Sequence, residues 1–285
     1  MSSYRELLNF GKNTLQKSGI GETEPDAWLL MEYVFGICRS WYFVHMEENA
    51  AEDKEQEYSK LIQKRAQHIP LQQLTHQAWF YGIEFYVNEH VLIPRQDTEV
   101  LVEEVLKEAG DKAGLQVLDM CTGSGCILLS LLENLKEAQG TGADLSEDAL
   151  LVAKKNGERL KRQVCWKKSD LFEKIHGKFN IIVSNPPYIE TKVIEDLMEE
   201  VRFHEPRMAL DGHEDGLFFY REITAKAGEY LEENGILAFE IGYDQGEAVC
   251  TLMKQEHYRE IRIVKDLAGL DRVVIGRKQQ EEKYV

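Results

Sequence analysis

Residues 117–126 read Val117-Leu118-Asp119-Met120-Cys121-Thr122-Gly123-Ser124-Gly125-Cys126, and an apolar run from Ile127 to Leu132 follows them. This order predicts a β-strand, a glycine-rich turn and a helix, as in nucleotide-binding α/β domains. Gly123 and Gly125 allow the backbone to approach a ligand closely, and the first turn of the helix offers unpaired N–H groups. A dinucleotide site remains an alternative. The spacing argues against it, because a third glycine is missing, and the Gly-Lys-Ser/Thr of a phosphate-binding P-loop is absent.

The next predicted strand ends in an acid. The segment Gly140-Thr141-Gly142-Ala143-Asp144 places this carboxylate at the C-terminal end of the strand. An acid at that point of a nucleoside-binding fold accepts both hydroxyl groups of a ribose. The alternative is a helix cap, but Ser146 and the acids after it already cap the following helix. We therefore expect Asp144 to bind a ribose.

The tetrapeptide Asn185-Pro186-Pro187-Tyr188 follows the apolar run Ile181-Ile182-Val183, at the end of a third predicted strand. The Asn185 side-chain oxygen can accept from an NH2 group, the Pro186 carbonyl can accept the second hydrogen, and Tyr188 can stack on the planar group. Such a loop suits methyl transfer to a poorly nucleophilic nitrogen. A purely structural turn is the alternative, because Asn-Pro is a common turn starter.

The rest of the second part of the chain alternates between strands and helices. An amphipathic helix is predicted from Asp97 to Glu108. Alternation of this kind predicts an α/β fold with a doubly wound sheet. The expected strands lie at Gln116–Met120, Thr141–Asp144, Val164–Lys168, Asn180–Ser184, Ile236–Ile241, Arg259–Lys265 and Arg272–Gly276.

The first part of the chain has a helical pattern. Helices are predicted from Tyr4 to Lys17, from Pro25 onward and from Asp53 to Gln67, and a β-hairpin is predicted from Gln77 to Val91. We therefore expect a small helical domain for substrate recognition at residues 1–75, a β-hairpin connector at 76–92 and the catalytic domain at 93–285. A free tail is expected from Gln279 to Lys283.

Composition narrows the class of protein. The chain has 34 basic and 50 acidic side chains, a net charge of −16, which opposes binding to nucleic-acid phosphates and favours a protein substrate. The five cysteines and scattered histidines have no metal-binding spacing, so we assign no metal. No signal peptide and no membrane-spanning stretch is expected, which predicts a cytoplasmic enzyme.

Several motifs in order resemble one known family, the release factor glutamine methyltransferases, a branch of the Rossmann-like methyltransferases that use S-adenosylmethionine. The resemblance spans about Pro70 to Gly276. Its blocks are Val91-Leu92-Ile93-Pro94-Arg95, Thr98-Glu99, the loop from Asp119 to Cys126, Ser169-Asp170-Leu171-Phe172, Ser184 to Tyr188, Glu205 to Gly212, Asp215-Gly216-Leu217, Tyr220-Arg221, Asp266 to Gly269 and Asp271-Arg272.

The resemblance implies S-adenosyl-L-methionine as the cofactor and a seven-stranded sheet that ends in an antiparallel strand. It implies methylation of the glutamine in the Gly-Gly-Gln motif of class-1 peptide chain release factors, which would be the protein partners, without stable nucleic-acid or membrane binding. The cofactor-binding residues are expected to be Cys121, Thr122, Gly123, Ser124, Gly125, Asp144, Asp170, Leu171 and Asn185. The catalytic residues are expected to be Asn185, Pro186 and Tyr188, which together with Pro187 would bind the substrate.

Some assignments near the site stay open. Arg95 and Glu99 are expected to order the loop above the site or to form a salt bridge at a helix start. The acids Glu195, Asp196, Glu199 and Glu200 are expected to form a solvated helix face. Three other functions remain: methylation of a ribosomal-protein glutamine, methylation of adenine in nucleic acid, and a non-enzymatic adaptor that senses S-adenosylmethionine.

Overall fold

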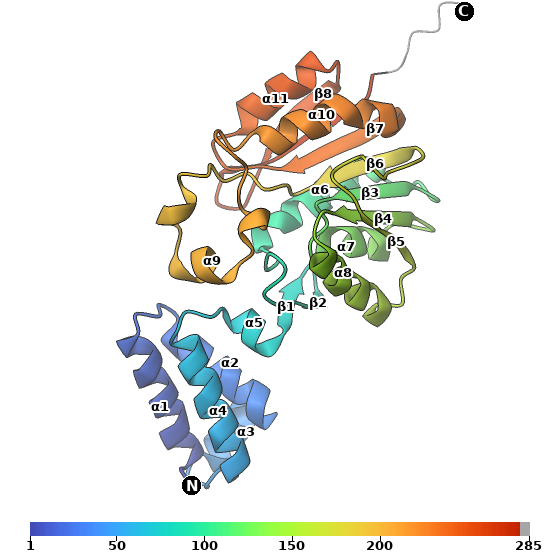
Figure 1. Ribbon diagram of the computed structural model, residues 1–285. Coiled ribbons are helices and arrows are strands. Elements are labelled where there is room, and N and C mark those ends of the chain that lie inside the picture. The colour runs from blue at the N-terminus through green and yellow to red at the C-terminus, as the bar shows by residue number, and fades with distance from the viewer. Residues whose placement is uncertain (280–285) are drawn as a thin grey trace, which may run out of the picture. The chain divides into compact units, whose positions relative to one another are not determined.

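The computed structural model describes residues 1–279, so the expected tail from Gln279 lies outside the described residues except for its first member. The chain divides into two compact units (Figure 1). The first, here called the N-terminal unit, contains residues 1–77 together with the distant segment 198–204. The second, here called the sheet unit, contains residues 78–197 and the chain from 205 onward.

The N-terminal unit is a bundle of helices. The first helix begins at a capping box, in which Ser3 accepts from the backbone of Glu6 and Glu6 accepts from the backbone of Ser3. The expected apolar positions Leu7, Leu8 and Leu15 are buried. A Cβ at Gly11 would lie 2.3 Å from the Tyr58 hydroxyl, so only glycine allows the close approach seen here. Its helices are α1 Tyr4–Lys17, α2 Thr23–Phe35, α3 Arg39–His45, α4 Glu52–Arg65, α5 Leu71–Thr75 and α9 Glu199–His204.

An ion network around the buried Arg65 joins α9 to the rest of the N-terminal unit. Arg65 Nε lies 2.6 Å from Asp26 Oδ2, and the same guanidinium pairs with Glu200. The His204 carbonyl accepts from Gln73 Nε2 at 2.6 Å. The interpretation of the acids around Glu200 as a solvated helix face is therefore wrong for that residue. Arg65 is distant in the sequence, and local charge patterning carries no signal for such a pair.

The sheet unit contains a seven-stranded sheet in the order β5-β4-β3-β6-β7-β9-β8. All neighbouring pairs from β5 to β7 are parallel, whereas β9 is antiparallel to both β7 and β8. The strands are β3 Gln116–Met120, β4 Gln139–Asp144, β5 Val164–Lys168, β6 Phe179–Ser184, β7 Leu231–Glu240, β8 Arg259–Lys265 and β9 Asp271–Arg277. The helices are η1 Gln96–Thr98, α6 Glu99–Ala109, α7 Cys126–Asn134, α8 Glu147–Arg159, η2 Ile194–Asp196, η3 Arg207–Ala209, α10 Phe218–Tyr230 and α11 Gly246–Gln255.

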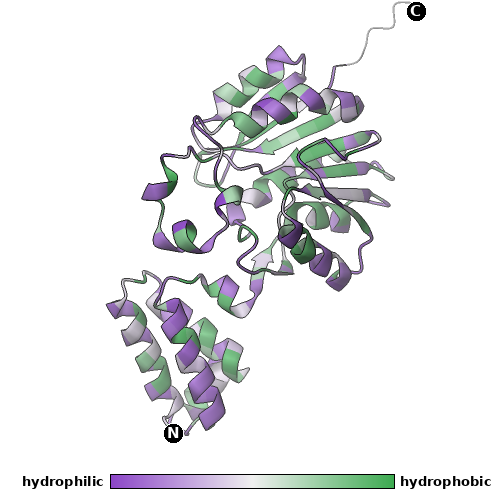
Figure 2. Ribbon diagram, viewed as in Figure 1, coloured by the Kyte–Doolittle hydropathy of each residue, from purple (hydrophilic) through white to green (hydrophobic). Residues whose placement is uncertain are grey.

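This sheet confirms the predicted doubly wound α/β fold. The last strand is antiparallel, as the resemblance implies, but it lies between β7 and β8 instead of at the edge. Two cores cover the two faces, because successive strand residues point to opposite sides. Val117 packs in one core with α6 and α7, and Leu118 packs in the other with α10 and α11. The central strands are accordingly apolar along most of their length (Figure 2).

The predicted hairpin is present as a separate two-stranded sheet of β1 Gln77–Phe80 and β2 Ile83–Tyr86. Tyr81 and Gly82 join the strands with φ values of 51° and 73°, the positive angles of a tight two-residue hairpin turn. Phe80 and Phe85 are buried in the same core as α6 and α7. The hairpin thus adds to the core that α6 and α7 form on one side of the main sheet.

Candidate active site

The glycine-rich loop between β3 and α7 has the conformation that its sequence predicts. Cys121, Gly123 and Gly125 have φ values of 60°, 54° and 79°. A Cβ at Gly123 would meet no atom within 4 Å, so this glycine borders open space. A Cβ at Gly125 would lie 3.1 Å from the Trp166 ring. The two glycines therefore differ: the first faces the site, and the second permits close packing behind it.

The acid at the end of β4 is held by two backbone groups. Asp144 Oδ2 accepts from Gly123 N and Oδ1 accepts from Ser146 N, both at 2.9 Å. Burial raises the pKa of Asp144, and these backbone hydrogen bonds oppose the rise. The backbone N–H of Leu145 also favours the charged form. A carboxylate has about four acceptor positions, so these backbone groups do not fill all of them. The geometry therefore suits a pair of neighbouring hydroxyl groups.

A second acid lies beneath the loop. Asp119 is fully buried, and its Oδ2 accepts from the Thr122 hydroxyl at 2.6 Å. Burial raises the pKa of Asp119 to about 7, and the nearby charge of Asp144 contributes to the rise. Its Oδ1 has no hydrogen-bond partner among residues 1–279. Asp119 thus stabilises the glycine-rich turn through its hydrogen bond with Thr122.

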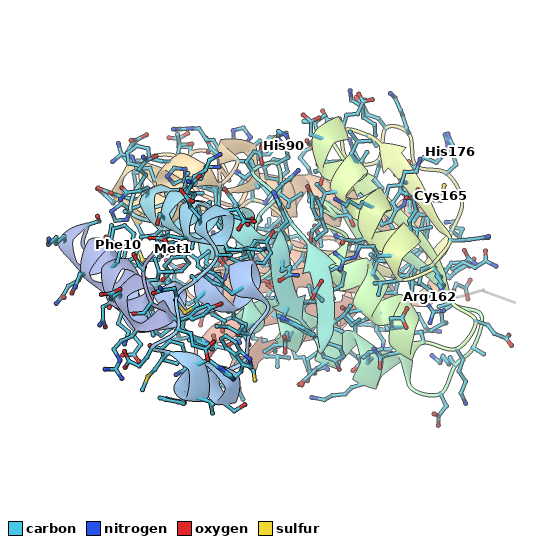
Figure 3. The ribbon with its side chains drawn as sticks, turned by 90° about the horizontal axis from the view of Figure 1, so that it is seen from below. Met1, Phe10, His90, Arg162, Cys165 and His176 are labelled. Atoms are coloured by element: carbon cyan, nitrogen blue, oxygen red, sulfur yellow. The ribbon has the colours of Figure 1, made fainter. Side chains whose placement is uncertain are left out.

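A cavity of about 480 Å³ opens above these residues, and all of its walls belong to the sheet unit. Apolar side chains such as Leu145 and Leu171 form much of the wall, and His90, labelled in Figure 3, lines it from the loop after β2. Of the sequence-predicted residues, nine line the cavity: Cys121, Thr122, Gly123, Ser124, Asp144, Asp170, Leu171, Asn185 and Pro187.

Three sequence-predicted site residues do not line this cavity. Gly125 packs against Trp166, as described above. Pro186 is buried in the loop, and Tyr188 packs on the core beneath α10 and α11. The Tyr188 hydroxyl points to Glu240 Oε1 at 3.5 Å. The contacts of Pro186 and Tyr188 with a substrate therefore stay predictions.

The loop after β6 is held at both ends. Ser184 donates to the Met120 carbonyl at 2.6 Å, and the Tyr188 carbonyl accepts from Gln245 Nε2 at 3.0 Å. A Cβ at Gly212 would lie 2.7 Å from Tyr188 Cα, and one at Gly216 would lie 2.3 Å from the Tyr188 carbonyl oxygen. These two glycines let the segment after η3 pack directly on the loop. Sequence reasoning assigned no role to Gln245.

Glu240 is the second residue that sequence reasoning missed. Glu240 is the last residue of β7 and is 2% exposed. It lies beside the loop that follows β6. Burial raises the pKa of Glu240 to about 7, and the side chains of Thr98 and Asn185 favour its charged form. The signal in the sequence is a lone acid within the apolar segment Leu237-Ala238-Phe239-Glu240-Ile241. An acid in such a strand needs an explanation.

Arg95 and Glu99 take separate partners. Arg95 lines the cavity and binds both carboxylate oxygens of the buried Glu205, at 2.6 and 2.7 Å. Glu99 accepts from the backbone N–H of Tyr81 at 2.8 Å. Arg95 therefore ties the loop before η1 to the segment that begins η3, and Glu99 ties α6 to the hairpin.

The arrangement can bind an extended ligand with two chemical ends. The carboxylate of Asp144 and the side-chain amide of Asn185 both line the cavity, so it offers an anionic acceptor and an amide group to one ligand or to two adjacent ones. Within residues 1–279, no group of three or more His, Cys, Asp or Glu side chains could hold a metal ion. In the same part of the chain, no helix combines the length and the apolar character needed to cross a membrane.

Comparisons with known proteins agree with this geometry. Two family models match: the PrmC N-terminal domain at residues 6–75 and the methyltransferase small domain at residues 95–216. The chain is 39% identical over 273 residues to the release factor glutamine methyltransferase of Agrobacterium fabrum, covering 94% of each chain. It is 38% identical over 283 residues to that of Caulobacter vibrioides, covering 95% of each. A methyltransferase structure from Pyrococcus furiosus covers 70% of this chain and 91% of its own, with a TM-score of 0.52 and 15% identity, which shows the shared fold.

Proposed function

The chain belongs to the release factor glutamine methyltransferase family, and we propose that it methylates the side-chain amide nitrogen of the glutamine in the Gly-Gly-Gln motif of class-1 release factors. The observation that carries this proposal is that Asn185 lines the same cavity as Gly123 and Asp144. A residue suited to hold an amide NH2 thus faces the cavity that suits the cofactor.

S-adenosyl-L-methionine is the cofactor, and when bound it supplies an electrophilic methyl group on a sulfonium sulfur. The residues present fit this molecule. Gly123 leaves open space where a side chain would stand, and the Asp144 carboxylate lines the cavity, where it can accept from the ribose hydroxyls. Asp170 and Leu171 line the wall beyond β5. We propose that they contact the adenosine.

Catalysis rests on positioning. A glutamine amide nitrogen shares its lone pair with the carbonyl, so it attacks only when it is held in line and its conjugation is weakened. We propose that Asn185 Oδ1 and the Pro186 carbonyl accept the two hydrogens of the NH2 group, and that Pro187 and Tyr188 confine the amide plane. Alignment of this kind can lower the activation barrier by on the order of 7–11 kcal/mol in the most favourable cases.

The loop does not need a strong base. As the new N–C bond forms, the nitrogen becomes acidic, and its proton leaves late to water or to a carbonyl oxygen that already accepts it. Gly212 and Gly216 pack directly on Tyr188 and so hold the loop that presents these carbonyl groups. The loop thus fixes the reacting nitrogen and gives the proton an exit.

The macromolecular partner is proposed from the family. The N-terminal unit matches the PrmC N-terminal domain model, and we propose that it recognises the release factor outside the motif. Free glutamine lacks such remote contacts and should be a very poor substrate. The net charge of −16 favours a basic protein surface over nucleic acid. We propose a cytoplasmic reaction, because release factors act in translation.

The decisive experiment offers labelled S-adenosylmethionine with a purified class-1 release factor, a ribosomal protein preparation and DNA in parallel. We expect one methyl group on the release factor, at the Gly-Gly-Gln glutamine, located by peptide mass spectrometry. A release factor with glutamate at that position should accept none, because it lacks the NH2 group. Methyl transfer to the ribosomal protein or to adenine, with the release factor unmodified, would overturn the substrate assignment.

A further inference from the structure

Glu240 is a buried acid placed directly beside the loop that holds Asn185. Strands β6 and β7 are parallel neighbours, and Ser184 pairs with Phe239 in their register. The next residues along the two strands are Asn185 and Glu240, so both leave the same edge of the sheet. Asn185 lines the cavity, whereas Glu240 does not. Glu240 therefore lies behind the residue that is proposed to hold the substrate.

The surroundings of Glu240 do not neutralise it. Its carboxylate oxygen Oε2 has no hydrogen-bond partner in the part of the chain that the structure describes. The cation nearby, Arg272, is shared with Asp266 at 3.0 Å and Asp97 at 3.5 Å. The titratable and charged groups that act on this carboxyl or feel its charge are Arg272 on β9, Asp97 on η1, Tyr188 after β6, Tyr220 on α10 and Cys126 on α7.

A buried carboxyl with an incomplete set of partners lowers the stability of a fold. Such groups are retained where function needs them. The donors that Glu240 has are informative, because the Tyr188 hydroxyl reaches its Oε1 at 3.5 Å and Asn185 favours its charged form. These two partners belong to the Asn185-Pro186-Pro187-Tyr188 loop, and a third donor, the Thr98 side chain, comes from η1.

We propose that Glu240 is a positioning residue: its carboxylate binds the NH2 end of the Asn185 side chain and thereby turns Asn185 Oδ1 toward the cavity. This inference rests on the proposed function, in which Oδ1 accepts from the target amide. A side-chain amide is ambiguous by itself, since one end donates and the other accepts. A carboxylate only accepts, so it selects the orientation in which the NH2 of Asn185 faces inward.

The ionisation state of Glu240 decides whether the Asn185 side-chain amide is held in this one orientation. Burial raises the pKa of Glu240 to about 7. The protonated carboxyl has an O–H group that donates to Asn185 Oδ1 equally well, so the preferred orientation is lost. The rate constant kcat/KM for the release factor should therefore fall as the pH drops through about 7.

The test is Glu240→Gln, which keeps the shape and removes the charge. At pH 8 we expect kcat/KM for the release factor to fall at least about tenfold, with the cofactor affinity measured by calorimetry unchanged within about twofold. The melting temperature should equal or exceed that of the wild type, because a desolvated charge is gone. The decline of activity below pH 7 should disappear. The matched control is Glu233→Gln, an exposed change in the same strand, which should alter none of these values.

A structural role predicts a different pattern. Loss of melting temperature together with loss of cofactor affinity, or kcat/KM within twofold of the wild type, would overturn the proposal. A second measurement applies if Glu240→Gln folds poorly. In an Asn185→Asp background the glutamine can donate to the new acceptor, so Glu240→Gln should raise kcat there instead of lowering it. Losses that simply multiply would contradict direct coupling.

These outcomes separate the two proposals. If the wild type leaves the release factor unmodified, the proposed substrate fails, and the Glu240 variants are compared on whichever methyl acceptor the wild type uses. If the wild type methylates the release factor and Glu240→Gln matches it over the whole pH range, only the positioning role fails.

Discussion

The carboxylate of Asp144 accepts a hydrogen bond from the backbone N–H of Gly123 at 2.9 Å, so one acid joins the end of β4 to the glycine-rich loop after β3. The same carboxylate lines the cavity. It therefore shapes the loop and remains available to a ligand. A substitution of Asp144 should therefore weaken the binding of the cofactor more than the binding of the methyl acceptor.

Replacing Asp144 by alanine should weaken S-adenosylmethionine binding by about 1.5–3 kcal/mol, because charge-assisted hydrogen bonds to the ribose are lost. Calorimetry measures the change. Asp148→Ala, an exposed acid in the first turn of α8, is the control and should leave the affinity unchanged. An unaltered affinity in a folded Asp144→Ala protein would refute the ribose assignment.

Asn185→Ala should separate binding from chemistry. The change removes the acceptor for the target NH2 but leaves the glycine loop intact, so turnover should fall at least about a hundredfold while cofactor affinity changes much less. Single-turnover kinetics and calorimetry measure the two quantities. Asn134→Ala, at the exposed end of α7, is the matched control. Equal turnover by the wild type and Asn185→Ala would make the loop purely structural.

Asp119 should impose a pH dependence on stability. Its folded pKa is about 7 and its ordinary value is 3.8, so between these values the folded state holds a proton that the unfolded state has released. The free energy of unfolding should therefore decrease as the pH rises through this window, by at most about 1.4 kcal/mol per pH unit for one proton. Asp119→Asn should flatten the dependence, as measured by urea unfolding at several pH values. Identical pH profiles would contradict the prediction.

The ion network of the N-terminal unit offers a test of stability. Asp26→Ala leaves the buried Arg65 with Glu200 as its remaining carboxylate partner. Breaking a buried pair typically costs about 3–5 kcal/mol, and we expect the lower end because Glu200 stays. Urea unfolding measures the loss, and amide exchange in α9 should accelerate. Glu24→Ala, which removes only the exposed pair with Lys12, should cost at most about 1 kcal/mol. Equal effects of the two changes would show that burial of Arg65 is unimportant.

The sequence determined the local elements and the placing of Asp144 and Asn185 at the ends of strands. Apolar runs of strand length and glycines at a turn define β3, its loop and α7 within a few residues, because backbone preference and side-chain alternation act over short distances. The strands β3, β5 and β8 have the predicted bounds, and α1 does as well. The position of Asn185 after β6 follows in the same way, since parallel strands end at one edge of the sheet.

Only the tertiary structure decided how distant segments complete the site. The place of β9 between β7 and β8, the closeness of Gly212 to Tyr188 and the pairing of Arg65 with Glu200 each join residues far apart in the chain. The same holds for Glu240, whose neighbour Asn185 lies 55 positions earlier (240 − 185). Local sequence encodes a residue's own preferences, whereas burial and electrostatics depend on which surfaces meet after folding. For that reason the loop could be recognised in the sequence, whereas the acid behind it stands out there only as a lone acid in an apolar strand and could not be placed beside Asn185.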